Sequence, residues 1–483
     1  MIGITAYGAY LPRMRLQKKS IADANGWFDA SLKGLGRGQK AVCNWDEDVI
    51  TMAVEAANDC LGQDAKDSIG ALILASTSAP FLDRQNSVVV AEALNLNTSG
   101  LRAADVTASQ RAATSALLFG LDIAASNPAA QSIVVGSEHR LTQVATREEM
   151  LYGDGAAALA VGSEKVLAEF IASYSHADDF IDHYRADGSK YDYGWEERWV
   201  RDEGYMKIVP AAVSALLSKA QVNVSDIAHF ILATDQSRVP AMLGKELGLK
   251  GDAIADNLLD TVGITGAAHP LLLLAHRLEQ AAPGDLILVV GFGQGCDALL
   301  FRATDAIQSK RPKYGVSGHL ARGRAEDNYN KFQSFNNLLE KGLGKRAEVD
   351  KQSYLSAMYR NKAFTTGFKG GKCSACGTVQ IPKHRYCVNP ECGASETQLE
   401  HPMSGATGHI ATWTADELTF DFNPPAYFGM VVFEGGGRLM MDITEVDPET
   451  FATGVEVDLH FRVKQIDTQR GFRKYFWKAI QVQ

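Results

Sequence analysis

The sequence predicts an α/β protein whose first 305 residues form a duplicated unit, followed by a small metal-binding module and a β-rich domain. Three observations lead to this fold class. Short apolar runs alternate with helical patterns, which is typical of a mostly parallel sheet covered by helices. Several residues of this first part recur at one fixed offset. From residue 371 on, glycine, cysteine and β-branched residues dominate.

The composition is that of an ordinary folded protein. The 483 residues are 46% hydrophobic and 22% charged, and the net charge is -9. An acidic balance argues against a nucleic-acid partner held through phosphates. No apolar run reaches the roughly 18 residues of a membrane helix, and the first residues do not resemble a signal peptide. We therefore expect a cytoplasmic protein without a membrane or nucleic-acid partner.

The strands and helices of the first part are read from apolar patterns. The expected helices include residues 46–61 and 114–126. The expected strands are rich in Ile, Val and Leu and end in small residues; they cover 70–77, 131–138, 157–162, 229–235 and 285–293. This alternation predicts a parallel sheet, whose active site lies beyond the carboxyl ends of its strands.

An internal repeat divides this part into two halves. Asp105, Ala112, Leu117 and the run 133–136 recur at one offset as Asp260, Ala267, Leu272 and the run 288–291. A repeat of this kind indicates a duplicated α/β unit, with a site between segments that follow equivalent strands.

The remaining chain changes character twice. Residues 306–370 are polar, and helical patches among them predict a helical connector. Beyond them, alternation of apolar and polar residues in 407–414, 427–434, 437–446 and 456–466 predicts a small β-barrel or sandwich.

Four cysteines near the start of this C-terminal part have the spacing of a zinc site. Cys373 and Cys376 are separated by two residues, and Cys387 and Cys392 by four. Thiolates from two tight turns surround one Zn²⁺ tetrahedrally. Four thiolates leave no position open for water, so we expect a structural Zn²⁺ that stabilises the fold.

Glycine-rich turns mark the candidate ligand site of the first part. Residues 151–164 and 291–301 each combine dense glycines with apolar segments, and in residues 105–118 small residues open a helix directly after a strand-like segment. Glycines at such turns allow close approach of the backbone to a ligand or to a neighbouring helix.

The order of these motifs resembles that of the thiolase-fold enzymes. It is most similar to 3-hydroxy-3-methylglutaryl-CoA synthase and its ketoacyl synthase III relatives, and DDFIDHYRADG (178–188) favours the former. The resemblance covers about residues 1–305 and implies a duplicated thiolase fold (layered αβαβα). The C-terminal part resembles the zinc-ribbon and OB-fold domains that accompany such enzymes.

The resemblance implies the domain boundaries, the substrate and the partners. We expect thiolase-like halves at 1–165 and 166–305, a connector at 306–370, a zinc ribbon at 371–400 and an OB-fold at 401–483. A coenzyme A thioester is the implied substrate, and the implied chemistry is a Claisen-type reaction through an acyl-cysteine. A homodimer is the implied assembly, with a thiolase or dehydrogenase as a further partner.

The sequence departs from the family pattern at the four catalytic positions. The nucleophilic cysteine falls on Gln110, beside Ser109. The family histidine falls on Asp235 and the asparagine on Ile264, and the glutamate region (76–84) has no glutamate. A glutamine forms no thioester, but its amide is able to hydrogen-bond a thioester or enolate oxygen.

The candidate catalytic residues are therefore Gln110, Ser109, Asp235 and His269. His269 is expected to open a helix of the second half, with a helix-start backbone bond as the alternative. Gly293, Gly295 and Cys296 are candidate substrate-binding residues, and Cys296 is not expected to be the nucleophile because no helix begins there to lower its pKa.

Two functions are compatible with this pattern. The first is acyl-CoA carbon–carbon bond chemistry of the hydroxymethylglutaryl-CoA synthase type, or a lyase or decarboxylase variant without a covalent intermediate. The second is a non-catalytic scaffold that binds acyl-CoA and channels intermediates between partner enzymes. The retained glycine turns favour the enzyme, and the four replacements favour the scaffold.

Overall fold

The computed structural model describes residues 1–62, 66–342, 352 and 354–482. They form two compact units. The first comprises Met1–Asn44, Asp48–Val88 and Asn97–Leu339. The second comprises Trp45–Glu47, Val89–Leu96 and Glu340–Gln483. The first unit thus continues past residue 305 into the predicted connector.

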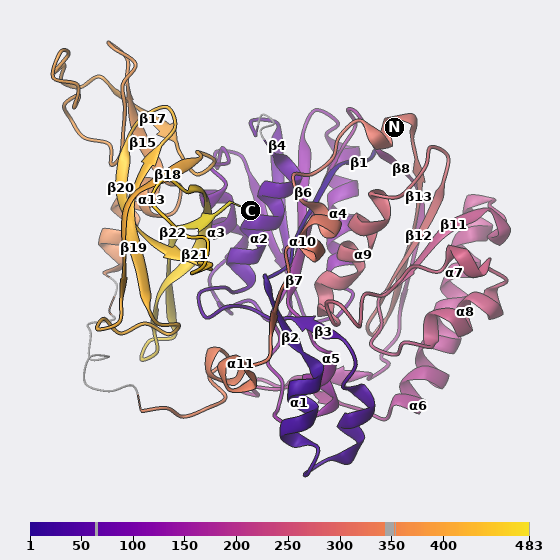
Figure 1. The fold of residues 1–483 in the computed structure, drawn as a ribbon. Helices are drawn as coiled ribbons and strands as arrows, with labels where there is room; N and C mark the ends of the chain where they lie inside the picture. The colour runs from indigo at the N-terminus through magenta and orange to yellow at the C-terminus, as the bar shows by residue number, and fades with distance from the viewer. Residues whose placement is uncertain (63–65, 343–351, 353, 483) are drawn as a thin grey trace. The chain divides into compact units, whose positions relative to one another are not determined.

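The first unit is built on a nine-stranded sheet of the order β11-β12-β13-β8-β1-β7-β6-β4-β5 (Figure 1). One half contains β1 (Gly3–Tyr10), β4 (Ile69–Ala75), β5 (Arg102–Val106), β6 (Gln131–Glu138) and β7 (Gly155–Gly162). The other contains β8 (Ala168–Ala177), β11 (Ile227–Leu232), β12 (Leu286–Phe292) and β13 (Gly295–Ala303).

The two halves repeat one pattern of strand pairing. In the first, β6 pairs antiparallel with β7 and parallel with β4. In the second, β12 pairs antiparallel with β13 and parallel with β11. The repeated runs 133–136 and 288–291 lie in the equivalent strands β6 and β12. The internal repeat read from the sequence is therefore a structural duplication.

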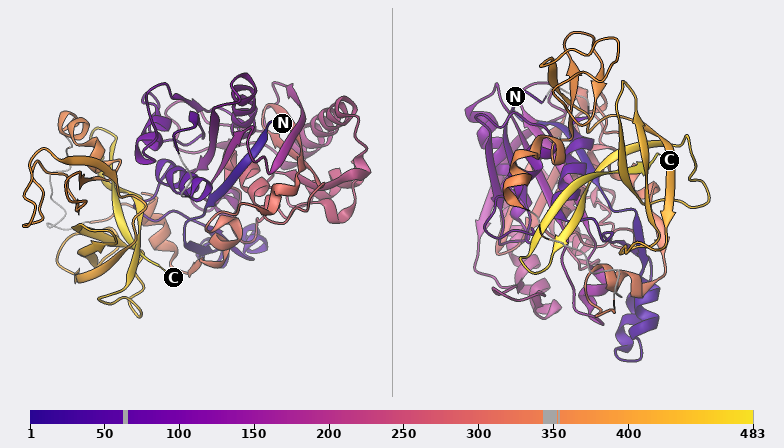
Figure 2. Two further views of the ribbon diagram at one scale, coloured as in Figure 1. Left: turned by 90° about the horizontal axis from the view of Figure 1, so that it is seen from above. Right: turned by 90° about the vertical axis from the view of Figure 1, so that its left-hand side faces the viewer.

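Helices cover the sheet on both faces (Figure 1; Figure 2). Helices α2 (Val49–Leu61) and α7 (Met206–Ala220) pack on β1 and β7 and on β8 and β13, respectively. Helices α4 (Ala112–Ser126) and α9 (His269–Leu278) contact each other and share one hydrophobic core with strands of both halves. This layering confirms the predicted duplicated thiolase-type α/β fold.

The start of α2 illustrates how side chains set the helix boundaries. The predicted helix began at residue 46, but Asp48 caps it instead. The Asp48 carboxylate accepts the Thr51 N–H at 3.0 Å, and the Thr51 hydroxyl accepts the Asp48 N–H at 2.8 Å. This reciprocal capping box satisfies two backbone donors, so the helix begins at Val49.

Shorter elements complete the first unit. The strands are β2 (Met14–Gln17), β3 (Gln39–Ala41), β9 (His183–Tyr184), β10 (Tyr193–Gly194) and β14 (Arg324–Glu326). The α-helices are α1 (Lys18–Asn25), α5 (Arg147–Leu151), α6 (Glu197–Trp199), α8 (Val239–Leu247), α10 (Gly315–Ala321) and α11 (Tyr329–Phe335), with a π-helical turn at Val200–Tyr205 between α6 and α7. Helix α3 (Asn86–Ala93) begins in the first unit and ends in the second.

The second unit contains the cysteine-rich module and a closed five-stranded barrel. Helices α12 (Leu355–Arg360) and α13 (Lys362–Thr365) precede a three-stranded sheet of β15 (Lys369–Cys373), β16 (Val379–Gln380) and β17 (Gln398–Pro402). The barrel strands are β18 (Gly408–Asp416), β19 (Ala426–Phe433), β20 (Arg438–Thr444), β21 (Glu456–Asp467) and β22 (Phe472–Gln481). Trp477 and Phe461 are fully buried in the barrel strands. The predicted small barrel is confirmed, with one strand more than the sequence had indicated.

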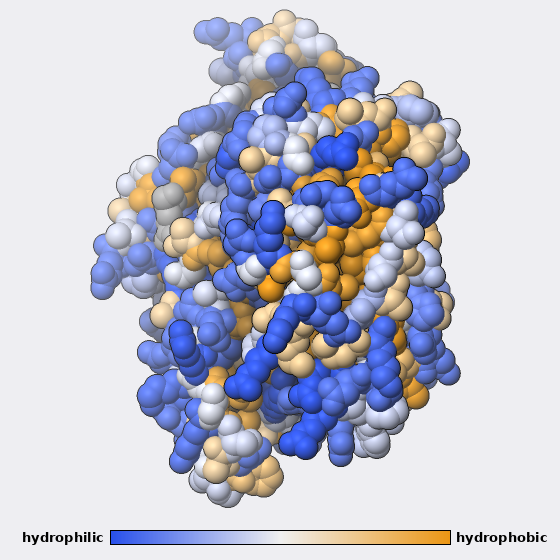
Figure 3. Space-filling view, turned by 90° about the vertical axis from the view of Figure 1, so that its right-hand side faces the viewer, coloured by the Kyte–Doolittle hydropathy of each residue, from blue (hydrophilic) through white to orange (hydrophobic). Residues whose placement is uncertain are grey.

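Polar residues dominate the face drawn in Figure 3, with hydrophobic residues gathered in one part of it. Among the described residues, no helix has both the length and the apolar character needed to cross a membrane.

Candidate active site and metal centre

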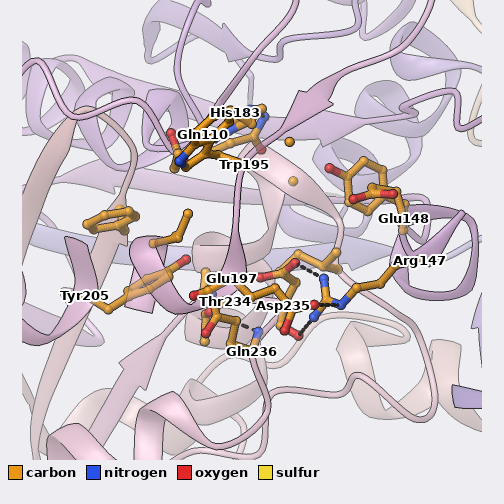
Figure 4. A pocket seen from close by; sticks show the side chains of 18 of the residues that line it. Gln110, Arg147, Glu148, His183, Trp195, Glu197, Tyr205, Thr234, Asp235 and Gln236 are labelled. Carbon is orange, nitrogen blue, oxygen red and sulfur yellow. Dashed lines mark hydrogen bonds and ion pairs between the residues drawn. The ribbon is translucent and has the colours of Figure 1, made fainter. Parts of the chain in front are cut away.

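A pocket with a volume of about 190 Å³ opens in the first unit, beyond the carboxyl ends of its parallel strands. Figure 4 shows two groups of side chains in it, with Gln110, His183 and Trp195 on one side and Arg147, Asp235 and Glu197 on the other. The lining residues are Gln110, Arg140, Arg147, Glu148, Tyr152, Asp182, His183, Gly194, Trp195, Glu197, Val200, Tyr205, Ala233, Thr234, Asp235, Gln236, Ile264, Gly266 and Phe292.

Gln110 lies in a tight turn between β5 and the start of α4. Ala108 in this turn has a φ of 70°, a left-handed conformation that is uncommon for a residue other than glycine. The Ser109 hydroxyl donates to the Gly293 carbonyl at 2.9 Å. A Cβ on Gly293 would lie 2.8 Å from the Ser109 hydroxyl oxygen, so only glycine allows this approach. The turn therefore holds Ser109 against the backbone and leaves Gln110 to face the pocket.

The Gln110 amide contacts His183. Its side-chain nitrogen lies 3.3 Å from His183 Nε2 and 3.4 Å from the Thr77 hydroxyl. Its side-chain oxygen is buried, with no hydrogen-bond partner in the described part of the chain. A buried unpaired amide oxygen is costly, and such groups concentrate at functional sites.

Asp182 orients the His183 ring. The Asp182 carboxylate lies 2.9 Å from His183 Nδ1, and both side chains are mostly buried. In the tautomer whose Nδ1–H donates to this carboxylate, the lone pair of Nε2 is directed at the Gln110 amide. Gln110, His183 and Asp182 therefore form one hydrogen-bonded chain, with a basic nitrogen next to an amide donor.

The β9–β10 hairpin that carries His183 is fixed by ion pairs. Asp192 lies 2.8 Å from the Arg185 guanidinium, across the hairpin, and 3.2 Å from that of Arg140. Arg185 also donates to the Thr77 carbonyl. The side chains of Arg140 and Asp192 are each only 5% exposed. This buried pair connects the hairpin to the end of β6 and holds His183 over Gln110.

A buried glutamate fixes the segment that follows β4. Glu138, fully buried, accepts the Thr77 N–H at 3.1 Å and the Ala267 N–H at 3.2 Å. It also accepts the hydroxyls of Ser76 and Ser78. A glutamate thus lies next to the segment 76–84, which has none of its own.

Asp235 lies in the same pocket but is engaged by a cation. Arg147 donates to its carboxylate at 2.7 Å and also pairs with Glu197. This arrangement suits Asp235 for holding Arg147 in place.

Like Ser109, the predicted catalytic residue His269 is not among the residues that line the pocket. It is fully buried, and its Nδ1 accepts the Thr265 N–H at 3.2 Å while Nε2 lies 3.0 Å from the Asn257 carbonyl. Burial and the charge of Arg140 lower the pKa of His269 to about 4. These partners satisfy both ring nitrogens of the neutral form.

Cys296 is also separate from the residues that line the pocket. It is fully buried in the second-half core, 3.9 Å from the Ile208 carbonyl. Burial and the neighbouring Asp297 carboxylate raise the pKa of Cys296 to about 12. A neutral, buried thiol is a poor nucleophile. Gly295 is the first residue of β13, and a Cβ there would lie 1.9 Å from the His176 carbonyl oxygen.

The four C-terminal cysteines come together in the second unit. Cys373, Cys376, Cys387 and Cys392 have sulfur atoms within 4.8 Å of one another. Tetrahedral Zn–S bonds of about 2.3 Å place two sulfurs roughly 3.8 Å apart, and two sulfur pairs here lie at 3.5 and 4.0 Å. Gly377 and Gly393 have positive φ angles of 79° and 56° and end the two turns. The residues therefore fit a tetrahedral metal.

Comparison with known proteins identifies the family. The hydroxymethylglutaryl-CoA synthase of Aeropyrum pernix is 31% identical over 333 residues, which cover 68% of this chain and 92% of the relative. That of Archaeoglobus fulgidus is 30% identical over 321 residues, with 65% of this chain and 93% of the relative covered. The chain belongs to the hydroxymethylglutaryl-CoA synthase family.

Domain models and solved structures agree with this assignment. The C-terminal model of 3-oxoacyl-[acyl-carrier-protein] synthase III matches residues 217–302, and the model of the ChsH2 C-terminal OB-fold domain matches residues 400–462. The crystal structure of HMG-CoA synthase complexed with CoA superposes with a TM-score of 0.60 at 18% identity, covering 73% of this chain and 94% of that one. The Aquifex aeolicus 3-oxoacyl-[acyl-carrier-protein] synthase III gives 0.55 at 21% identity, covering 62% and 100%. The resemblance drawn from the motifs is thus confirmed.

Within this hydroxymethylglutaryl-CoA synthase fold, the site contains residues that the sequence alone did not single out. His183, Asp182, Arg147 and Trp195 all line the pocket with Gln110 and Asp235. The segment 178–188 was the signature that favoured the family, and the histidine within it was the available signal. The contact of His183 with Gln110 has no signal in the sequence, because Gln110 lies 73 positions earlier in the chain and only the hairpin brings the two side chains together.

Proposed function

We propose that the protein makes or breaks a carbon–carbon bond next to the thioester of an acyl-CoA, without an acyl-enzyme intermediate. Membership of the hydroxymethylglutaryl-CoA synthase family supports acyl-CoA as the substrate class. The observation that carries the proposal is the chain Gln110–His183–Asp182, in which an amide donor and a basic nitrogen meet in the pocket. The amide occupies the place where the family has its nucleophile.

In the proposed reaction, the Gln110 amide and the His183 imidazole have different tasks. Gln110 Nε2 donates to the thioester oxygen and stabilises the negative charge of the enolate, as oxyanion donors do. His183 Nε2 accepts a proton from a 3-hydroxyl group, the bond between C2 and C3 breaks, and the electron pair moves into the thioester enolate. His183 then returns the proton to C2. The products are a shortened acyl-CoA and an aldehyde or ketone, so atoms and charge balance.

The charges around the pocket favour this cleavage over decarboxylation. Four carboxylates line the pocket, from Glu148, Asp182, Glu197 and Asp235, against the two guanidinium groups of Arg140 and Arg147. Both guanidinium groups are already paired with carboxylates. A substrate carboxylate would meet net negative charge with no free cation among the lining residues. We therefore propose a 3-hydroxyacyl-CoA with an uncharged acyl chain as the substrate.

The C-terminal module completes the proposal. We propose that Cys373, Cys376, Cys387 and Cys392 hold a structural Zn²⁺, because four converging thiolates leave no open coordination position. The OB-fold barrel that follows serves as the acyl-CoA-associated domain implied by the resemblance to such accessory domains.

The test is cleavage of short 3-hydroxyacyl-CoA thioesters by the full-length protein, with the shortened acyl-CoA quantified by chromatography. We expect turnover, and a His183→Ala variant at least about 100-fold slower, as for loss of a general base. A His384→Ala variant, altered in the second unit, should match the unaltered protein. Binding of acyl-CoA without turnover of 3-hydroxyacyl or malonyl thioesters would contradict the enzyme proposal and support the scaffold.

A further inference from the structure

A second group of metal-binding side chains lies in the first unit, outside the residues that line the pocket. Cys43, His139 and Asp154 each offer a ligand atom, and these atoms all lie within 4.8 Å of one another. Cys43 follows β3, His139 follows β6, and Asp154 directly precedes β7. Three separate segments thus bring a thiol, an imidazole and a carboxylate to one point, one after β3 of the three-stranded sheet and two next to β6 and β7 of the nine-stranded sheet.

The backbone around these side chains holds them in place. His139 Nδ1 lies 3.0 Å from one oxygen of Asp154, and the other oxygen accepts the Cys43 N–H at 2.8 Å. The Asp154 N–H donates to the Ala41 carbonyl at 2.9 Å, and the His139 N–H to the Ser78 hydroxyl at 2.9 Å. Second-shell hydrogen bonds of this kind orient ligands before a metal arrives.

The donor set and its burial indicate which ion would fit. Cys43 is 2% exposed, and the side chains of Asp154 and His139 are 8% and 18% exposed. Cysteine sulfur, histidine nitrogen and aspartate oxygen are the three donor types that zinc takes in proteins. The Met52 thioether, 3.7 Å from the Cys43 sulfur, is not one of these donor types.

We propose that Cys43, His139 and Asp154 bind a second Zn²⁺ ion, distinct from the one held by the C-terminal cysteines. A divalent cation balances a buried thiolate and a buried carboxylate, which are costly to bury alone. The ion joins the end of β3 to the strands β6 and β7. Arg140, which follows His139, lines the pocket. The bound zinc therefore holds the backbone next to this pocket residue in place.

The first experiment counts zinc by mass spectrometry in the full-length protein purified without chelator. We expect two zinc ions per chain. Each of the variants Cys43→Ser, His139→Gln and Asp154→Asn should retain one ion, and Cys60→Ser, which alters another buried thiol near β1, should retain both. His139→Gln replaces the most exposed ligand, so it is the variant best suited to keep the fold; circular dichroism and gel filtration verify this for each protein.

The second experiment isolates the proposed site. In the full-length protein loaded with Co²⁺ in place of zinc, Cys43→Ser should remove one Co²⁺ per chain together with the part of the thiolate-to-metal charge-transfer absorption that belongs to the second site. One zinc per chain in the unaltered protein, or two zinc ions in folded Cys43→Ser and His139→Gln, would overturn the proposal. Rapid reaction of Cys43 with iodoacetamide in the unaltered protein as purified would also overturn the proposal. It would show that Cys43 binds no metal and that hydrogen bonds alone hold the three side chains together.

Discussion

The side-chain nitrogen of Gln110 lies 3.3 Å from Nε2 of His183, so an amide and an imidazole nitrogen meet in the pocket. A glutamine forms no thioester with an acyl group, but its amide is able to donate a hydrogen bond to a thioester oxygen. A covalent route needs a thiolate at the start of α4, whereas a non-covalent route needs a donor for the enolate and a group that moves a proton. We propose that Gln110 and His183 serve as the second combination.

The first prediction concerns the donor. Gln110→Ala should lower the turnover of a 3-hydroxyacyl-CoA by roughly 10²–10³-fold, as is typical of losing one oxyanion-hole donor. The reduction should fall on kcat, because the interaction strengthens as the enolate forms. Gln280→Ala, at an exposed position just beyond the end of α9, is the matched control. Steady-state kinetics check this, and an unchanged kcat for Gln110→Ala would remove the amide from the mechanism.

The second prediction concerns Cys296. Its raised pKa of about 12 keeps the thiol protonated at neutral pH, so we expect no acyl-cysteine after incubation with acetyl-CoA. Cys296→Ser should keep its activity within a few-fold, although a hydroxyl in an apolar core lowers stability by about 1–3 kcal/mol. Peptide mass spectrometry and kinetics check both parts. A stable acetyl adduct that Cys296→Ser abolishes would restore a covalent Claisen mechanism.

The third prediction concerns the C-terminal zinc. Cys373→Ser or Cys387→Ser should remove the ion of that site and unfold the barrel, because metal-binding energy is folding energy in such modules. Zinc content and thermal melting measure the two effects, and Ser374→Ala, within the same turn, should change neither. If these variants had an unchanged zinc content and an unchanged melting temperature, the four thiolates would bind no metal.

The fourth prediction concerns assembly. In the described part of the chain, strand β5 ends the sheet and pairs only with β4, and Arg102, Ala104 and Asp105 in it are exposed. An unprotected edge strand is a template for pairing with another chain, and a two-fold axis makes the same strand meet itself. We expect a dimer with twice the chain mass of 52.2 kDa.

Light scattering at micromolar concentration measures this mass. Ala104→Pro should shift the protein toward the monomer, because proline cannot donate a ladder hydrogen bond, while Ala177→Pro at the exposed end of β8 should leave the mass unchanged. A strictly monomeric unaltered protein would contradict the prediction.

Patterns that are local in the sequence predicted the fold well, and contacts between distant segments explain what they missed. Apolar runs located β6 and β12, and cysteine spacing located the four converging thiolates, since both depend on neighbouring residues. The sequence analysis did not predict strand β22, although the side chains of Tyr475, Trp477 and Ala479, at every second position, are buried.

The candidate site was predicted less completely than the fold. Gln110 and Asp235 line the pocket as expected from the motif order. His183 did not stand out because its role depends on the β9–β10 hairpin and on the buried Arg140–Asp192 pair. Neither the hairpin nor the pair has a signal in a short window of sequence.

The fifth prediction concerns His269 and pH. Its pKa is about 4 in the folded protein, against the ordinary 6.5, chiefly because of burial. Between these values the unfolded chain binds a proton that the folded chain does not, so stability falls as the pH drops from 6.5 to 4. The full loss is about 3 kcal/mol at 1.36 kcal/mol per pKa unit. Above pH 6.5 His269 contributes no pH dependence, because both states are neutral.

Urea unfolding at a series of pH values, followed through the transition of the first unit, measures this slope. His269→Gln should be less stable at pH 7, since it disturbs the bonds to Thr265 and Asn257. Its stability should nevertheless fall less steeply than that of the unaltered protein between pH 6.5 and 4, by close to one proton. His409→Gln, an exposed histidine of the second unit, should leave the slope unchanged. Equal slopes for the unaltered protein and His269→Gln would show that the pKa of His269 is not lowered in the folded protein.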